Sequence, residues 1–167
     1  MRDPVVAILG LGKGAGITCA RKFAEFGWSV MIIDGDQKVL DRAEDDLGEL
    51  VCYLHEDQTT RLGLKNALSG TLEQFDGVDV LLNIPPIMDP VGLDELTLDR
   101  VSQDLKATAS TALMAAQGFG REMIREIKER DENADRLPYK KSFIQLLSRA
   151  AVSVDGGAPL QTVTQGA

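Results

Sequence analysis

Four glycines lie close together near the start of the chain, in the segment Gly10-Leu11-Gly12-Lys13-Gly14-Ala15-Gly16. The segment follows a short apolar run and precedes residues with the spacing of a helix. Glycines at such a position let the chain turn sharply and let backbone N–H groups approach a pyrophosphate closely, while the N-terminus of the following helix attracts the anion. The pattern therefore predicts a dinucleotide site. The residues predicted to contact the dinucleotide there are Gly10, Gly12, Lys13, Gly14, Gly16 and Ile17.

An acidic residue, Asp34, ends the next apolar run, at about the 20-residue spacing that a dinucleotide site requires. Its carboxylate can accept hydrogen bonds from both hydroxyls of an adenosine ribose, and it repels a 2′-phosphate. Lys13 could neutralise any phosphate, including the additional phosphate of NADP. Because Asp34 lies where that phosphate would be, the sequence favours NAD over NADP. The alternative is a purely structural turn in which Asp34 caps the next element.

Apolar runs alternate with amphipathic segments along the chain, which predicts parallel strands covered by helices on both faces. The predicted strands are Val5–Leu9, Val30–Ile33, Leu50–Leu54, Val78–Leu82 and Ser142–Leu147. The predicted helices cover approximately residues 16–26, 37–46, 64–75 and 97–129. The charged segment Asp131–Lys141 is predicted to be a solvated connection. Short strands joined by helical crossovers indicate an α/β fold with three layers, a doubly wound, Rossmann-like parallel sheet with strand order 3-2-1-4-5.

With these features together, the chain resembles the short-chain dehydrogenase/reductases over essentially its whole length. The family's glycine pattern, TGxxxGxG, is present as Leu9–Gly16, except that leucine replaces the threonine. Asp57 follows the third strand, where the family has an aspartate that contacts adenine, and Asn83 matches the first residue of the family's NNAG motif. Ile84-Pro85-Pro86 replaces the rest of that motif. Because proline lacks an N–H group and fixes φ, the loop that faces the cofactor ribose must differ from the family's.

The resemblance also locates the family's four catalytic positions, and three of them have changed. Asp104 replaces an asparagine, and Gln161 and Gln165 replace the tyrosine and lysine of the YxxxK motif. Ser148, which follows the fifth strand, is retained. In the family the tyrosine is the general acid/base, whereas a glutamine amide does not ionise near neutral pH and cannot exchange a proton with a substrate. The resemblance therefore implies NAD(H) binding with weak or absent dehydrogenase activity of the family type.

Three other functions stay open from the sequence. The chain could be an enzyme that uses residues outside the usual set, or a non-catalytic partner or regulatory subunit that uses the fold for oligomerisation. The family's dimer interface, formed by its fourth and fifth helices, implies a homodimer or homotetramer. An S-adenosylmethionine-dependent methyltransferase also has a glycine loop and a later acidic residue. Methyltransferases usually carry an acidic residue just before the glycines, however, where this chain has Ala7-Ile8-Leu9.

Length and composition exclude several classes of protein. The chain has 167 residues, of which 44% are hydrophobic and 26% charged, so disordered, collagen-like and disulfide-rich classes do not fit. The net charge of -8 disfavours binding to nucleic acids and to anionic membranes. Two cysteines and a start without a signal peptide predict a cytoplasmic protein. His55 is the one histidine, so a histidine-rich metal site is not available, and no metal is expected.

The chain is short for the family it resembles. Members of that family continue beyond the tyrosine helix into segments that recognise the substrate. The resemblance therefore implies one dinucleotide-binding domain over residues 1–167 that lacks the C-terminal substrate-binding portion, and the sequence does not indicate which small molecule would be the substrate.

Overall fold

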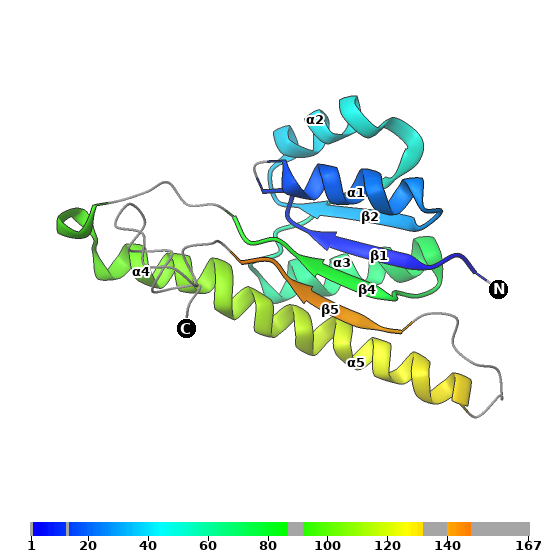
Figure 1. Ribbon diagram of the computed structural model, residues 1–167. Helices are drawn as coiled ribbons and strands as arrows, with labels where there is room; N and C mark the ends of the chain where they lie inside the picture. The colour runs from blue at the N-terminus through cyan, green and yellow to red at the C-terminus, as the bar shows by residue number, and fades with distance from the viewer. Residues whose placement is uncertain (1, 13, 87–91, 132–139, 148–167) are drawn as a thin grey trace.

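The computed structural model describes residues 2–12, 14–86, 92–131 and 140–147. Its centre is a sheet of five parallel strands in the order β3-β2-β1-β4-β5, with helices on both faces (Figure 1). The strands are β1 (Val5–Leu9), β2 (Ser29–Asp34), β3 (Cys52–His55), β4 (Val80–Asn83) and β5 (Ser142–Gln145). The chain changes direction across the sheet between β1 and β4, so the predicted doubly wound α/β fold and its strand order are confirmed.

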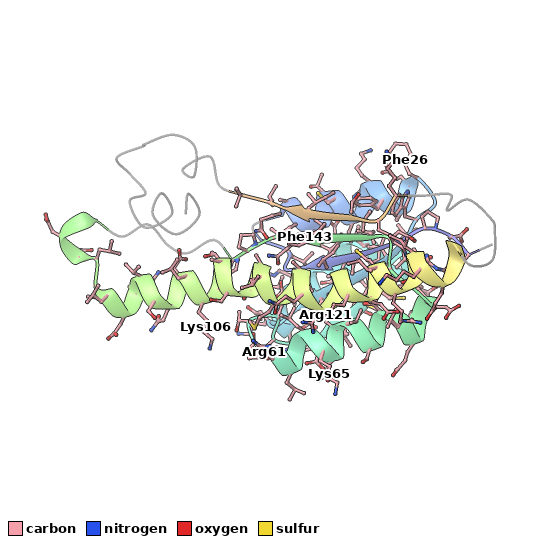
Figure 2. The ribbon with its side chains drawn as sticks, turned by 90° about the horizontal axis from the view of Figure 1, so that it is seen from below. Phe26, Arg61, Lys65, Lys106, Arg121 and Phe143 are labelled. Carbon is pink, nitrogen blue, oxygen red and sulfur yellow. The ribbon has the colours of Figure 1, made fainter. Side chains whose placement is uncertain are left out.

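The helices form the two outer layers. On one face lie α1 (Ala15–Glu25) and α2 (Gln37–Leu47), and on the other lie α3 (Arg61–Phe75) and α5 (Thr111–Asp131) (Figure 1). Helix α4 (Leu98–Leu105) precedes α5 in one long rod that extends beyond the carboxyl ends of the strands. Seen from below, α5 runs beside α3 (Figure 2). Short 3-10 turns, Gly48–Leu50 and Leu93–Glu95, precede β3 and α4.

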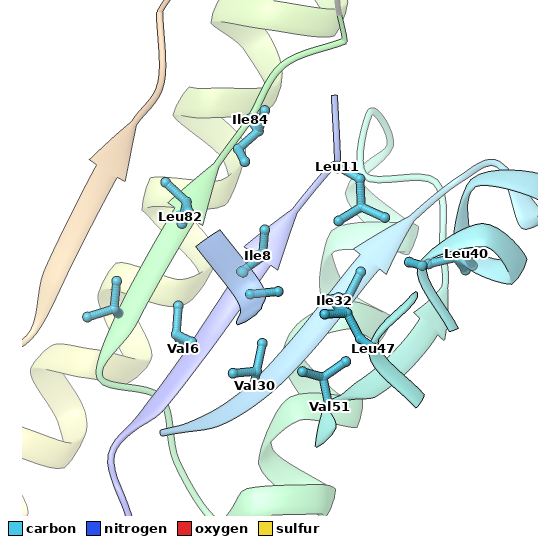
Figure 3. Packing of buried hydrophobic residues seen from close by; sticks show 13 residues of the cluster. Val6, Ile8, Leu11, Val30, Ile32, Leu40, Leu47, Val51, Leu82 and Ile84 are labelled. Carbon is cyan, nitrogen blue, oxygen red and sulfur yellow. The ribbon is translucent and has the colours of Figure 1, made fainter. Parts of the chain in front are cut away.

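Both faces of the sheet are buried, which explains why the strands are continuously apolar. Along β1, Val6 and Ile8 belong to one buried cluster with Ile32 of β2 and with Leu40 and Leu47 of α2 (Figure 3). The alternate residues Ala7 and Leu9 face the other layer and pack with apolar residues of α3 and α5, which are Leu64, Ala67, Ala115, Phe119 and Met123. Because β1 is packed on both faces, its carboxyl end has a fixed position. The glycine loop starts from that end.

A π-helical segment, Lys106–Ser110, joins α4 to α5. The sequence predicts one continuous helix over residues 97–129, and the structure confirms the extent of that helix but not its regularity. The Thr108 hydroxyl donates to the carbonyl oxygen of Asp104 at 2.7 Å, and such side-chain bonds compete with the regular helical pattern. Single π turns inside α-helices are frequent at functional sites.

A cluster of buried charges ties the amino ends of the strands together, opposite the glycine loop. Asp79, which precedes β4 and is only 4% exposed, accepts hydrogen bonds from the Arg2 guanidinium and from the amide of Val5 at 2.8 Å. Lys141, just before β5, places its Nζ 2.9 Å from Asp79 Oδ1. Asp79 therefore connects the starts of β1, β4 and β5.

Glu126 of α5 completes this cluster. Its carboxylate accepts from Lys141 Nζ at 2.5 Å, from Arg2 at 3.1 Å and from the amide of Val78 at 3.1 Å. Lys141 also donates to the carbonyl oxygen of Val78 at 2.7 Å. Side chains thus form hydrogen bonds with both the amide and the carbonyl group of Val78. Strand β4 therefore begins at Val80 rather than at the predicted Val78. The prediction that Asp131–Lys141 is solvated is wrong for Lys141, whose side chain is 4% exposed.

The contacts within this cluster lower the pKa of the Asp79 carboxyl group. Burial alone would raise the pKa of its carboxyl group. The hydrogen bonds from Arg2, from the amide of Val5 and from Lys141 outweigh burial and hold the pKa of Asp79 below its ordinary value. The cluster is therefore a set of compensated charges rather than a neutral hydrogen-bond network.

Candidate functional site

The glycine loop joins β1 to α1 at the carboxyl edge of the sheet, and two of its glycines serve close packing. Gly10 has a φ of +80°, and a Cβ at this position would lie 2.3 Å from the carbonyl oxygen of Ile84. A Cβ on Gly16 would lie 2.6 Å from the Cα of Leu11. Neither position can accept a side chain without movement of the backbone. Gly10 holds the loop against the end of β4, and Gly16 holds it against the first turn of α1.

The other two glycines open towards a cleft. Gly12 has a φ of +56° and Gly14 a φ of +106°, backbone conformations that side chains rarely adopt. A Cβ on Gly14 would have no atom within 4 Å, so nothing in the described chain fills the space beside it. Gly14 is also the N-cap of α1 and makes no side-chain cap hydrogen bond. The N-terminus of α1 is therefore accessible to a bound anion.

Asp34 fixes the loop from the end of β2. Its Oδ2 accepts from the amide of Leu11 at 3.0 Å, and its Oδ1 accepts from the amide of Asp36 at 2.9 Å. Asp34 thus stabilises the turn that follows β2, but the N-cap of the next element, α2, is Asp36 rather than Asp34, as the alternative had it. Each carboxylate oxygen has a second acceptor site. Asp34 can therefore keep both amide contacts and still accept from a ligand.

These residues share one cleft of about 770 Å³. The volume is within the range of roughly 300–1,000 Å³ that is typical of small-molecule and cofactor sites. The cleft is lined by Gly10, Leu11, Gly12, Gly14, Ile17, Asp34, Asp36, Val39, Arg42, Gln58, Ile84 and Pro86. Five of the predicted cofactor residues are brought together here, namely Gly10, Gly12, Gly14, Ile17 and Asp34.

Three predicted cofactor residues that the structure describes do not line this cleft. Gly16 is buried against Leu11. The carboxylate of Asp57 is bonded within its own loop. Its Oδ1 accepts from the amide of Thr59 at 2.9 Å and from the hydroxyl of Thr59 at 2.7 Å. Asn83 is 1% exposed and donates through Nδ2 to Oε1 of Gln145 at 2.7 Å. Asp57 therefore shapes the loop before α3, and Asn83 ties β4 to β5.

Several residues of the cleft were missed at the level of the sequence. Asp36, the N-cap of α2, and Val39 and Arg42 within the helix are spaced three apart, and this spacing is the signal that could have indicated that they share one side. Gln58 follows Asp57 directly in the same loop. The Gln58 side chain lines the cleft, whereas the Asp57 side chain does not. Pro86 comes from the Ile84-Pro85-Pro86 segment, where the sequence predicted an altered loop.

The catalytic positions are not brought together within the described residues. Asp104 lies near the end of α4 and is fully buried. Ser148, Gln161 and Gln165 lie outside the described residues, as does Lys13 of the glycine loop.

A second cavity of about 180 Å³ lies between α3 and α5. Arg61, Lys65 and Arg121 border it, and their side chains lie on the same side of the molecule as Lys106 (Figure 2). Its volume is below the range of typical cofactor sites. The large cleft is therefore the stronger candidate for a functional site. Within the described ranges, no helix is both long enough and apolar enough to cross a membrane.

Comparison with known proteins identifies the family. A family model described as short chain dehydrogenase matches residues 4–132, well over half of the chain. The chain belongs to the short-chain dehydrogenase family. Relatives of this chain include an uncharacterized oxidoreductase of Thermotoga maritima, 27% identical over 128 residues, which covers 75% of this chain and 50% of the relative. The short-chain dehydrogenase reductase 3b of Arabidopsis thaliana is 28% identical over 127 residues, covering 72% of this chain and 49% of the relative.

Solved structures share the fold of this chain. The crystal structure of gox2181 superposes with a TM-score of 0.82 at 20% identity, covering 99% of this chain and 62% of that protein. The NADH-dependent reductase A1-R′, complexed with NAD, has a TM-score of 0.78 at 19% identity, covering 99% of this chain and 68% of that protein. The chain spans about half the length of the curated relatives that it matches.

Proposed function

We propose that this member of the short-chain dehydrogenase family binds NAD(H) in the large cleft. The observation that carries the proposal is that one cleft joins the glycine loop, the N-terminus of α1 and the carboxylate of Asp34. Amide N–H groups in the first turn of a helix have no partner within the helix and attract a pyrophosphate. The pyrophosphate would lie at Gly12 and Gly14, and the adenosine ribose would lie at Asp34. The NAD complex of the similar reductase A1-R′ agrees with this proposal.

We propose NAD rather than NADP because the carboxylate of Asp34 cannot easily move away from the ribose. The backbone amides of Leu11, in the glycine loop, and of Asp36, in the turn after β2, each donate to one of its two oxygens. Arg42 also lines the cleft, and its charge would favour an additional phosphate. However, the Arg42 Nε already donates to the carbonyl oxygen of Lys38 at 3.0 Å, which directs this side chain along α2. The negative charge of Asp34 at the end of β2 therefore decides the preference for NAD over NADP.

The replacement Asp34→Asn tests the proposed binding mode. Asparagine loses the charge and can accept from only one of the amides of Leu11 and Asp36, so we expect the Kd for NADH to rise by at least about tenfold, as for loss of a charge-assisted hydrogen bond. The Kd for NADPH should fall because the repulsion of its 2′-phosphate is removed. Calorimetric titration with both dinucleotides measures the two changes.

Asp41→Asn is the matched control for this experiment, because it removes the same charge from an exposed position on α2 outside the cleft and retains an oxygen for the contact with Gln37. We expect it to leave the ratio of the two affinities unchanged. Absence of NADH binding by the unmodified protein at millimolar concentration would refute the proposed function. An equal change of the ratio in both variants would refute the role of Asp34.

We further propose that hydride transfer by the family mechanism is weak or absent. Bound NAD(H) would supply the hydride donor or acceptor, but a carbonyl or alcohol also needs a positioned proton donor or acceptor. Gln161 and Gln165 stand where the family has its tyrosine and lysine, and Asp104 stands in place of its asparagine. Loss of a positioned acid or base typically lowers the rate by about 10²–10⁴.

The paired replacement of Gln161→Tyr and Gln165→Lys tests this second proposal. We expect the double variant to reduce a panel of carbonyl compounds with NADH at least about 10² times faster than the unmodified chain. The oxidation of NADH, followed by its absorbance, measures both rates. Turnover by the unmodified chain that Ser148→Ala abolishes would contradict the proposal and would indicate an enzyme with a different set of residues.

We also propose a cytoplasmic protein that forms a homodimer or homotetramer. Large apolar side chains on the rod of α4 and α5 remain exposed, with Leu98 at 89%, Leu113 at 60% and Ile124 at 55%, and these support an oligomer interface along the rod. The family match does not favour the methyltransferase alternative.

A further inference from the structure

The smaller cavity, between α3 and α5, is built from one stripe of each helix. Helix α3 contributes Arg61, Leu64, Lys65 and Leu68, and α5 contributes Met114, Gln117, Gly118 and Arg121. Each set follows the i, i+3, i+4, i+7 spacing of one helix face. The three apolar side chains belong to the buried cluster on this side of the sheet or pack against it, whereas the three cationic residues are exposed. The cavity therefore has an apolar floor and a cationic rim.

The positive charges of the rim are not compensated by the protein. The side chains of Arg61, Lys65 and Arg121 form no hydrogen bond or ion pair with the residues that the structure describes. They lie on the same side of the molecule as Lys106, which is also exposed (Figure 2). Arg125, one turn further along α5, pairs in contrast with two glutamates of its own helix. The chain has 26 acidic and 18 basic residues, so a general shortage of carboxylates does not explain the difference.

Two of these cations occupy unfavourable positions on α3. Arg61 is the first residue of the helix and Lys65 follows one turn later, while the first turn holds no acidic residue. The N-terminus of a helix carries a partial positive charge, which repels cations. Like charges four residues apart on a helix also repel each other. An anion bound in the cavity would relieve both repulsions.

Gly118 gives an independent indication that the cavity has an occupant. This glycine lies inside α5, where it destabilises the helix relative to alanine. Close packing does not require it, because a Cβ at this position would have no atom within 4 Å among the described residues. Gly118 therefore leaves space open beside the three cations, and a ligand would fill that space.

We propose that this cavity binds a small organic phosphate monoester. Arginine and lysine both bind phosphate, and the planar guanidinium of arginine can donate to two phosphate oxygens at once. The phosphate lies at the cationic rim, and the organic part lies on the apolar floor. The cavity volume of about 180 Å³ is less than a quarter of the 770 Å³ of the large cleft, which suits a ligand smaller than a dinucleotide. The inference does not depend on dinucleotide binding in that cleft.

Calorimetric titration with n-butyl phosphate and with inorganic phosphate tests this inference. We expect butyl phosphate to bind the unmodified chain at least about tenfold more tightly, because its alkyl chain is buried on the apolar floor. Equal affinity for the two compounds would indicate an adventitious ion only and would overturn the inference.

Variants locate the bound phosphate, since the glycine loop can also attract one. We expect Lys65→Gln to raise the Kd for butyl phosphate about tenfold, as for loss of a charge-assisted hydrogen bond. Gly118→Leu should raise this Kd by a similar factor because leucine fills the cavity. The melting temperature of Gly118→Leu without ligand should be no lower than that of the unmodified chain, because leucine favours the helix more than glycine does.

Lys128→Gln is the matched control, because it makes the same exchange at an exposed position of α5 that does not line the cavity. We expect it to keep the affinity for butyl phosphate. An equal loss in Lys128→Gln and Lys65→Gln would overturn the inference. Binding that survives in both Lys65→Gln and Gly118→Leu would also overturn it, because the phosphate would then lie elsewhere.

A lipid headgroup is the other source of a phosphate monoester. Sedimentation with phosphatidylcholine vesicles that contain phosphatidic acid distinguishes the two sources. We expect no co-sedimentation, because the net charge of -8 repels an anionic surface. Co-sedimentation without binding of butyl phosphate would overturn the assignment of a small soluble ligand.

Discussion

Replacement of Asp79 by alanine is expected to lower the free energy of unfolding by about 3–5 kcal/mol, the usual effect of removing one partner from a buried ion pair. The carboxylate of Asp79 accepts from Arg2, from the amide of Val5 and from Lys141. Alanine would leave the ammonium of Lys141 buried with Glu126 as its remaining acidic partner among the described residues. It would also leave the amide of Val5 without its acceptor at the start of the central strand.

The pH dependence of this difference gives a second measurement. The contacts lower the pKa of Asp79 in the folded state. A lowered folded-state pKa contributes stability above the unfolded-state pKa, which is about 3.9, and the contribution is lost as the pH falls through the folded-state value. The difference in stability between the unmodified chain and Asp79→Ala should therefore be constant near neutral pH and shrink as the pH falls below about 4.

An exposed ion pair provides the control for Asp79. Lys22 and Glu25 are paired on α1 with side chains 62% and 49% exposed, so Glu25→Ala should change stability by less than about 1 kcal/mol. Urea unfolding at neutral and acid pH measures both variants. A loss in Asp79→Ala as small as that in Glu25→Ala would show that the buried cluster contributes nothing specific.

This cluster also shows where reasoning from sequence stops. Apolar runs and helical spacing are local signals, and they predicted the five strands, their order and the helices. Asp79 contacts Arg2 from 77 residues away, and Glu126 contacts Arg2 from 124 residues away. No periodicity marks such pairs. Lys141 therefore looked like part of a solvated segment until the sheet brought it beside Asp79.

Some residues of the cleft could likewise be predicted from the sequence, and others could not. Gly12, Gly14 and Asp34 could be predicted because a strand, a turn and a helix fix their positions locally. Asp57 and Gln58 are neighbours in one loop, and the sequence cannot tell which of two adjacent side chains enters the cleft. The structure separates them through the hydrogen bonds of Asp57 to Thr59, which leave Gln58 as the residue that lines the site.

Replacement of Gly10 by alanine is expected to lower the free energy of unfolding by about 2–4 kcal/mol and to abolish NADH binding. A left-handed conformation costs alanine about 1–2 kcal/mol. The new Cβ would also lie 2.3 Å from the carbonyl oxygen of Ile84, so the loop or the end of β4 must move. Such movement weakens the hydrogen bonds from the Gly10 amide to Ile33 and from the Ile84 amide to Leu9, both at 2.8 Å, each worth about 0.5–1.5 kcal/mol.

Gly27→Ala separates the two causes, because Gly27, which follows α1, has a φ of +76° but a Cβ at this position would have no atom within 4 Å among the described residues. It carries the conformational cost without the contact, so we expect a loss of about 1 kcal/mol and unchanged NADH affinity. Denaturant unfolding and NADH titration of both variants measure the effects. Equal losses of stability in the two variants, or NADH binding by Gly10→Ala, would show that close packing of the loop against Ile84 does not shape the site. A larger loss in Gly10→Ala alone would mean that the glycine loop is held by the sheet before any dinucleotide arrives, because the contact with Ile84 lies entirely within the protein.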